Sequence, residues 1–434
     1  MYNDNLNTIN HFNNISIGYL FRLQIYMFKN KYQFFIIMLV LCAGYTVSQF
    51  LRTSIGVLSP SLMIDFNISP NNMGLLGGVF FLSFALFQIP AGILIDRYGP
   101  RNIMTLIIFF AVIGSVIFAS SNSFFDLLAG RVLMGLGCSI CLMGSLVLIT
   151  RWTDRDQFSK LAGIILAVGG LGGLLATTPL SYLSDLYGWK LSFWIASGIT
   201  FLVMVLYYSI LKDYRESNTL NNEKKSISLN NILIIFKERN FKYMIPMSLM
   251  SYSSLVVILG LWGAPYLKDI HGLDNTERGK ILMLMAISWN LGSFTFGRLS
   301  SVFGNYKRVV IFGSSGVIAL LIILASIPRL ESIYLYIIFC ILGFFGAFSV
   351  ALLSHYQTLF DKEYMGRALS TANFFNFGGV FLIQWLSGKI IYLMGGNSNA
   401  APIEAYRVAF LFVAILLFIS LIIYLWSNEN KKSF

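Results

Sequence analysis

The chain carries little charge. Only 12% of its 434 residues are Asp, Glu, Lys or Arg, about half the share of a typical soluble protein, whereas 56% are hydrophobic. Long apolar runs recur along it, and each can cross a bilayer core of roughly 30 Å. This composition excludes a soluble globular protein and predicts an all-α polytopic membrane protein.

The few charges are mainly basic, with a formal net charge of +12. A basic chain can bind nucleic acid, but the cytoplasmic loops of membrane proteins also collect Lys and Arg. We therefore expect no nucleic-acid partner. The expected partner is membrane lipid, and the expected state is a monomer.

Cysteine is scarce, and its positions do not support redox or metal chemistry. The four cysteines (Cys42, Cys138, Cys141, Cys340) all lie inside apolar runs, so no disulfide framework is expected. Cys138 and Cys141 have CxxC spacing but no second Cys or His pair, so we interpret them as small packing residues. No nucleophile–base set or phosphate-binding loop is visible either. The sequence therefore predicts no enzyme activity, no metal and no cofactor.

Carboxylates are missing from the middle of the apolar runs. All 19 Asp and Glu residues fall in loops, in the terminal segments or near the ends of runs. A carboxylate or histidine inside the membrane often relays protons. Here Asp65, Asp126 and His355 come nearest, each at a boundary. The sequence therefore shows no clear proton relay near the middle of a span.

Twelve apolar runs follow one another along the chain. We place them at 34–60, 72–95, 103–119, 124–150, 161–183, 191–211, 242–266, 281–300, 308–328, 333–355, 368–394 and 406–426. The longest polar interval separates six runs from six, which predicts twelve transmembrane helices in two six-helix bundles. The expected parts are an N-terminal arm at 1–33, a bundle at 34–211, a central loop at 212–241, a second bundle at 242–426 and a tail at 427–434.

The basic residues are unevenly divided between the two sides of the membrane. If the N-terminus is inside, the segments on that side hold 22 of the 31 Lys and Arg residues, and the opposite loops hold six. Cytoplasmic segments of membrane proteins carry such an excess. We therefore expect both termini in the cytoplasm and the chain in the inner or plasma membrane.

Two loops of the first half return in the second half at nearly the same offset. Segment 92–101 (GILIDRYGPR) has two glycines seven residues apart and a basic end, and so does 297–308 (GRLSSVFGNYKR), 205 residues later. The segments that begin at Asp154 and Asp361 match at an offset of 207 residues. These matches indicate a duplicated unit. Two halves of this kind are typical of one transporter architecture, in which the substrate site lies between the halves near the bilayer midplane.

Together these features resemble the major facilitator superfamily over roughly residues 34–426: twelve helices, a six-plus-six repeat, a basic central loop and GILIDRYGPR after the second helix. The motif Arg131-x-x-x-Gly135-x-Gly137 on the fourth helix is also similar to a pattern of that family. The resemblance implies transport of a small-molecule substrate by alternating access. Because carboxylates are missing from the middle of the runs, exchange or facilitated transport fits at least as well as proton symport. We expect Arg131, Gly135 and Gly137 to have a structural role, with Arg131 tying the fourth helix to its neighbours.

The resemblance also implies a gate at the loop after the second helix. In the superfamily the acidic residue of this loop resembles a latch that holds helix 2 against the N-terminal end of helix 11, whose dipole favours an anion. On this sequence the gating residues so implied are Gly92, Asp96, Arg97, Gly99, Arg101 and Arg151. The second copy of the loop has Ser301 in place of the acid, which predicts a gate latched mainly on one side.

A polar stripe follows the first helix. Tyr45, Gln49 and Arg52 recur at helical spacing, and Arg52 lies too deep in its run for an unpaired guanidinium to face lipid. An arginine can bind a carboxylate or phosphate through two parallel hydrogen bonds. Alternatively, Arg52 caps a neighbouring helix or pairs with a carbonyl.

Polar residues of the second half could complete a site opposite this stripe. Asn373 and Asn376 share one face of helix 11, and helices 7 and 8 offer further groups. Alternatively, such groups only join helices by hydrogen bonds. The predicted substrate-binding residues are Tyr45, Gln49, Arg52, Trp262, Asn290, Asn373 and Asn376.

Segment 48–60 resembles the first helix of the organophosphate and organic-anion branch of the superfamily. The phosphate exchangers of that branch have a second arginine on helix 7, and the corresponding position here lies near Val256. A single arginine suits a monoanion or zwitterion, such as a carboxylate, an amino acid or a small peptide. The alternative function is a transporter-like sensor that binds a small metabolite and signals to a partner.

Overall fold

The computed structural model describes residues 4–150, 155–211, 238–303, 305–359 and 362–428, and the regular structure within these ranges is helical. Eleven segments of this described part are long and apolar enough to cross a membrane. A further helix, α12 (Asn275–Phe303), matches α2 in length at 29 residues but has a more polar middle. With α12 the helices correspond to the twelve predicted runs.

The described residues of the first half form six spans. Helices α5 and α6 share one span, which breaks at Ala176 and Thr177 just before Pro179. The elements are α1 (Asp4–Asp65), α2 (Pro70–Tyr98), α3 (Pro100–Ala119), α4 (Phe124–Thr150), α5 (Arg155–Leu175), α6 (Thr178–Tyr187) and α7 (Trp189–Ile210).

The second half also forms six spans, two of them interrupted. One span contains three α-helical pieces and the π-helix η1, and another is divided at Ala347. The elements are α9 (Arg239–Ser251), α10 (Ser253–Val257), η1 (Ile258–Trp262), α11 (Gly263–His271), α12, α13 (Tyr306–Ser326), α14 (Ser332–Gly346), α15 (Phe348–Leu359), α16 (Lys362–Leu393) and α17 (Ile403–Tyr424).

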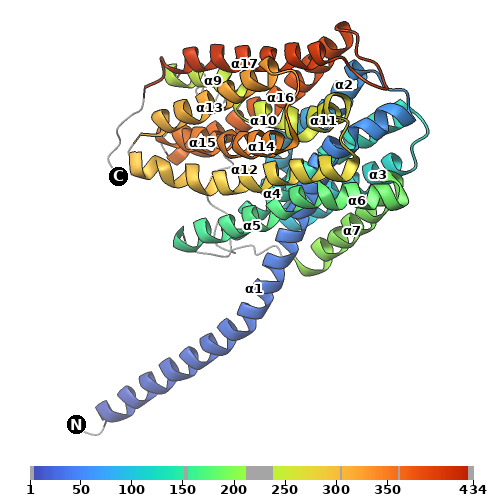
Figure 1. Cartoon of the computed structure of the whole chain (residues 1–434). Coiled ribbons are helices and arrows are strands. Elements are labelled where there is room, and N and C mark those ends of the chain that lie inside the picture. The colour runs from blue at the N-terminus through green and yellow to red at the C-terminus, as the bar shows by residue number, and fades with distance from the viewer. Residues whose placement is uncertain (1–3, 151–154, 212–237, 304, 360–361, 429–434) are drawn as a thin grey trace.

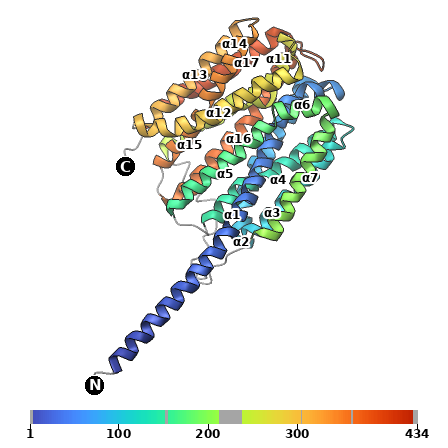
Figure 2. The same ribbon diagram turned by 60° about the horizontal axis from the view of Figure 1, so that its bottom comes forward.

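The helices of the two halves gather into two bundles that lie against each other (Figure 1). Contacts between the bundles involve α2 with α16, α1 with η1 and α11, and α6 with α12. Both ends of the chain lie toward one side, and α1 continues as one helix well beyond the bundles there (Figures 1 and 2). We call this side the terminal face and the opposite side the loop face.

Large apolar side chains are exposed on the outer helices. On α7 they include Trp194 and Phe201, and on α17 they include Phe418 and Ile422. Such a surface would be unfavourable in water, but it matches the hydrocarbon of a bilayer. The fold is therefore that of an integral membrane protein.

The arm expected at 1–33 is described from Asp4 onward as the first part of α1. The central loop expected at 212–241 lies outside the described residues, except for 238–241 at the start of α9. Of the tail, 427 and 428 are described.

A proline in the seventh span frees a backbone acceptor for the other half. Pro265 has no N–H with which to bond the carbonyl of Leu261, four residues earlier, and the chain forms the π-helix η1 just before it. The hydroxyl of Ser59, on α1, donates to this Leu261 carbonyl at 3.0 Å. A local break in one half thus becomes a contact with the other.

Candidate functional site

A cavity of about 330 Å³ lies between the two halves. The first half contributes residues of α1 and α5, and the second half contributes Tyr252, between α9 and α10, and residues of α12, α15 and α16. Gly163 lies in the part of α5 near the terminal face, and Phe294 lies in the corresponding part of α12. The cavity therefore extends from mid-membrane toward the terminal face.

Arg52 is the single charged residue among those that line this cavity in the described part of the chain. Its side chain is 5% exposed. The guanidinium carbon lies 4.7 Å from the ring centre of Phe84 on α2 and 5.1 Å from that of Phe377 on α16. A guanidinium is stabilised over aromatic faces, so Arg52 bridges an aromatic ring of each half.

The other two residues of the predicted stripe line the same cavity. Tyr45 and Gln49 are both buried, and close packing against α5 holds this part of α1 in place. A side chain on Gly169 would collide with the Tyr45 ring, and one on Gly172 would collide with the Thr46 carbonyl. The glycines of α5 thus let the polar stripe of α1 sit at the edge of the cavity.

Two predicted asparagines from the second half also line the cavity. The amide of Asn290 donates to the Ala286 carbonyl at 2.8 Å, and the Asn376 oxygen accepts from Ser251 at 2.9 Å. One end of each amide is therefore held by its own half. Asn373, one turn before Asn376, is half-buried but is not among the cavity-lining residues.

Trp262, also a predicted substrate-binding residue, is not among the residues that line the cavity. Its side chain is buried, and the indole N–H donates to the hydroxyl of Ser387 on α16 at 2.9 Å. This contact joins η1 to α16, so we leave Trp262 out of the proposed site. Val256 lies near the position that corresponds to the second arginine of the phosphate exchangers. It lines a smaller pocket beside the cavity.

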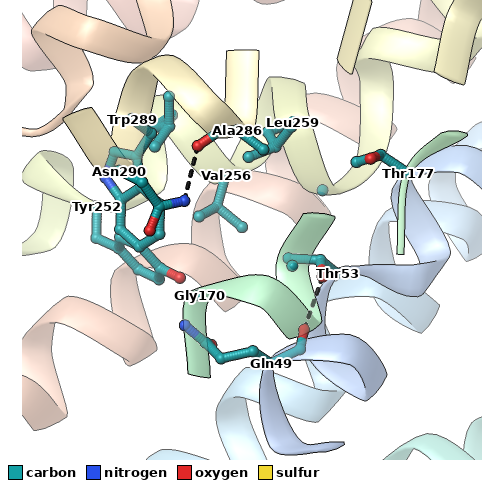
Figure 3. A pocket seen from close by; sticks show the side chains of 13 residues that line it. Gln49, Thr53, Gly170, Thr177, Tyr252, Val256, Leu259, Ala286, Trp289 and Asn290 are labelled. Atoms are coloured by element: carbon teal, nitrogen blue, oxygen red, sulfur yellow. Dashed lines mark hydrogen bonds between the residues drawn. The ribbon is translucent and has the colours of Figure 1, made fainter. Parts of the chain in front are cut away.

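The smaller pocket has a volume of about 20 Å³ and shares Gln49, Tyr252, Trp289 and Asn290 with the cavity. In Figure 3, Tyr252, Trp289 and Asn290 lie on one side of it and Gln49 and Thr53 on the other. Tyr252 and Arg52 both line the cavity. The pocket thus continues the cavity from the level of Arg52 along α1 toward the loop face.

Tyr252 and Trp289 are among the further groups that helices 7 and 8 offer in the sequence, and both line the cavity. Their ring centres are 6.1 Å apart, and Tyr252 also meets Phe377 at 5.7 Å. They are not in the predicted set of binding residues, because aromatic residues make up 15% of this chain and residue type alone does not single them out.

On the loop-face side of the cavity the two halves are in close contact. Asn275 of α12 donates to Asp185 of α6 at 2.7 Å, and Ser181 of α6 donates to the Asn275 carbonyl at 2.9 Å. A side chain on Gly56 of α1 would collide with the Leu259 carbonyl of η1. These contacts close the site on this side.

Arg131 has the contacts expected of a residue that ties α4 to its neighbours. It is fully buried and donates to the carbonyls of Leu51 at 2.7 Å, Leu76 at 3.4 Å and Gly77 at 3.4 Å. Its guanidinium also lies over the ring of Phe80, with 4.6 Å between the guanidinium carbon and the ring centre. The guanidinium thus connects α4 with both α1 and α2.

Gly135 and Gly137 let α4 pack tightly. A side chain on Gly135 would collide with the Phe80 carbonyl of α2, and one on Gly137 would collide with Ala111 of α3. Because even a methyl group would not fit, these positions hold three helices at close approach.

The predicted gating loop forms a tight turn at the terminal face. Gly99 ends α2 with φ of +85°, a conformation that residues with side chains rarely adopt, and Pro100 begins α3. A side chain on Gly92 would come within 3.2 Å of Met143 on α4. Arg97 is exposed, and its guanidinium lies over Tyr98, the next residue.

Arg101 donates to the Tyr208 carbonyl of α7 at 2.7 and 3.0 Å. The side chain of Asp96 lies outside the described part of the structure, and so does Arg151. The latch itself therefore stays a prediction.

Among known proteins, the chain is 28% identical over 206 residues to an uncharacterized transporter of Buchnera aphidicola, covering 46% of this chain and 50% of the relative. It is 22% identical over 250 residues to a hexuronate transporter of Bacillus subtilis, covering 56% and 57%. The matched segments thus span about half the length of these relatives.

Two solved structures share the fold. One is a bacterial homologue of the human lysosomal transporter Spinster, in an inward-facing and occupied conformation, with a TM-score of 0.75, 19% identity and coverage of 90% of this chain and 96% of that one. The other is the nucleoside transporter NupG, with a TM-score of 0.71, 13% identity and coverage of 90% and 98%.

The family model of the Major Facilitator Superfamily matches residues 41–384, which include the predicted gating loop and every predicted substrate-binding residue. This match covers most of the chain and agrees with the twelve spans and the cavity between two bundles. The chain belongs to the major facilitator superfamily of membrane transporters.

Proposed function

We propose that the protein is a secondary transporter that moves a small organic anion or zwitterion across the membrane by alternating access. The observation that carries this proposal is the position of Arg52, a buried guanidinium between Phe84 of one half and Phe377 of the other. A substrate bound by this arginine would contact both halves at once. Its binding could therefore be linked to their relative movement.

The charge of the cavity supports a monoanion or a zwitterion. No carboxylate and no second cation are among the lining residues in the described part of the chain. A single guanidinium is neutralised by one carboxylate, whereas a dianion would bring an unpaired charge into a site of low dielectric. The hexuronate transporter among the relatives is compatible with a carboxylate substrate and with the organic-anion branch of the family.

The closed loop face and the cavity toward the terminal face support one end state of the transport cycle. With both termini in the cytoplasm of the inner or plasma membrane, as the distribution of Lys and Arg favours, this state faces inward. We propose that the bundles 34–211 and 242–426 are the units that rock against each other. Asp96 would then hold the terminal face closed in the opposite state.

Transport by purified protein in liposomes tests the proposal. We expect saturable uptake or exchange of small organic anions that Arg52→Ala abolishes while the protein still inserts and remains monodisperse. Arg52→Lys keeps the charge but loses the planar fork, so a large part of the activity should also be lost. Arg308→Ala, which removes an exposed arginine at the start of α13, is the matched control and should transport normally.

Normal transport by the Arg52→Ala variant would contradict the site. Ligand binding without any flux, together with a co-purifying membrane partner, would indicate the sensor instead of a carrier.

A further inference from the structure

We propose that the substrate is a monocarboxylate with a flat, apolar body, such as an aromatic ring, and not a polyhydroxylated acid or an amino acid. This inference rests on the proposed function, because it assigns the carboxylate to Arg52. It concerns the walls of the cavity next to that arginine.

An aromatic wall continues from Arg52 into the cavity. The Arg52 guanidinium carbon lies 5.1 Å from the ring centre of Phe377. Phe377 meets the Tyr252 ring at 5.7 Å, and Tyr252 meets the Trp289 ring at 6.1 Å. The first pair meets edge to face and the second is tilted, and the three rings together line this part of the cavity. A ligand whose carboxylate is held by Arg52 would place its body against these rings, which favour contact with another flat ring.

The wall offers few hydrogen-bonding groups for a sugar acid. One end of each cavity asparagine is already engaged, and the Ser293 hydroxyl donates to the Trp289 carbonyl at 2.8 Å. A polyol brings several hydroxyl groups, each able to donate and to accept. Hydroxyl groups that leave water without such partners weaken binding, so this cavity disfavours a polyol.

An ammonium group is less suited to the same walls. No Asp or Glu is among the residues that line the cavity in the described ranges. An amino acid would bring a second positive charge beside the Arg52 guanidinium with no carboxylate of the protein to neutralise it, and aromatic faces offset such a charge only in part. A phenyl monocarboxylate makes the same ring contacts without this penalty.

The test compares three probes: 3-phenylpropionate, phenylalanine and gluconate. The second adds an ammonium to the same body, and the third replaces the ring with hydroxyl groups. Binding to the purified full-length chain is measured by thermal shift, and transport is measured as counterflow in liposomes. We expect 3-phenylpropionate to bind at least roughly tenfold more tightly than either of the others.

Two variants test whether the aromatic wall causes the preference for 3-phenylpropionate. Trp289→Leu keeps an apolar side chain but removes the ring and its N–H, and it should weaken 3-phenylpropionate binding roughly tenfold while leaving the weak gluconate binding unchanged. Trp194→Leu removes an exposed tryptophan of α7 and is the matched control, with no expected effect.

A preference for gluconate or phenylalanine, abolished by Arg52→Ala, would overturn the inference but leave the proposed function intact. An equal effect of Trp289→Leu on all probes would also overturn it. If the probes and a broader set of organic anions neither bind nor move, both the inference and the proposed function fail.

Discussion

Arg101 at the start of α3 fastens the end of α7, because its side chain donates two hydrogen bonds to the backbone carbonyl of Tyr208 at 2.7 and 3.0 Å. Its guanidinium also lies over the Tyr208 ring, 5.1 Å from the ring centre. The last carbonyls of a helix have no partner within the helix and carry the negative end of its dipole. A cation at this position therefore stabilises the helix end.

The second half repeats this arrangement. Lys307, the second residue of α13 as Arg101 is of α3, donates to the carbonyls of Leu425 at 2.6 Å and Ser427 at 2.8 Å, at the end of α17. In each half, a basic residue at the end of the repeated loop motif thus donates hydrogen bonds to the carbonyls at the end of the last span. This shared contact gives the internal repeat a structural basis that does not depend on gating.

We therefore predict that Arg101→Ala lowers the stability of the protein by about 1–2 kcal/mol, because a charge-assisted pair of hydrogen bonds is lost at a partly exposed site. Lys307→Ala should have a similar effect. The measurement is the melting temperature of the purified protein in detergent. Arg308→Ala, next to Lys307 but exposed, is the control. Unchanged melting of Arg101→Ala with slower transport would assign this arginine to the gate instead.

The spans were largely predictable because the bilayer imposes a minimum apolar length. The runs at 72–95 and 191–211, for example, correspond to α2 at Pro70–Tyr98 and α7 at Trp189–Ile210. The breaks inside spans were not predicted. Pro265 was visible in the sequence, but the π-helix before it depends on a partner for the Leu261 carbonyl, and that partner, Ser59, is 202 residues away.

The site was predictable where helical spacing alone decides which residues share a face. Tyr45, Gln49 and Arg52 follow one uninterrupted stretch of α1, and all three line the cavity. Trp262 is the last residue of a π-helix, and a period of 3.6 residues does not hold across such a turn. The ring of Phe377 over Arg52 depends on how the halves pack, which spacing within one helix cannot indicate.

Arg131 offers a second test of stability. Its buried guanidinium donates to carbonyls of α1 and α2, so Arg131→Ala would remove these bonds and leave a void among three helices. We expect a loss of about 3 kcal/mol or more, seen as a lower melting temperature and lower yield of folded protein. Arg131→Lys should recover part of this loss. If Arg131→Ala were fully stable but inactive, Arg131 would have a direct role in transport.

The proposed latch predicts an effect on rate without an effect on affinity. Asp96→Asn removes the charge that would favour the N-terminal end of α16 while keeping the size of the side chain. Turnover in liposomes should fall severalfold, with substrate affinity near normal in a thermal-shift titration. Ser301→Asn, at the matching place of the second half, is the control and should have little effect. Normal turnover of Asp96→Asn would argue against the latch.

The last prediction concerns closure at the loop face. Gly56 lies where α1 meets η1, and a side chain there would collide with the Leu259 carbonyl. Gly56→Val should therefore keep the two halves apart on this side and favour the opposite conformation. Ser59→Ala removes one buried hydrogen bond of about 1 kcal/mol, so it should shift the equilibrium roughly fivefold in the same direction.

A cysteine pair can report this closure. The side chains of Asp185 on α6 and Asn275 on α12 are 2.7 Å apart, so Asp185→Cys with Asn275→Cys should be joined by a short thiol-specific cross-linker when the loop face is closed. In a background without the four native cysteines, cross-linking should be efficient in the parent and reduced by Gly56→Val. Gly198→Val, on α7 with open space around its Cβ position, should cross-link like the parent. Because the control adds the same side chain to another helix, efficient cross-linking of a folded Gly56→Val variant would mean that closure does not need the contact between α1 and η1.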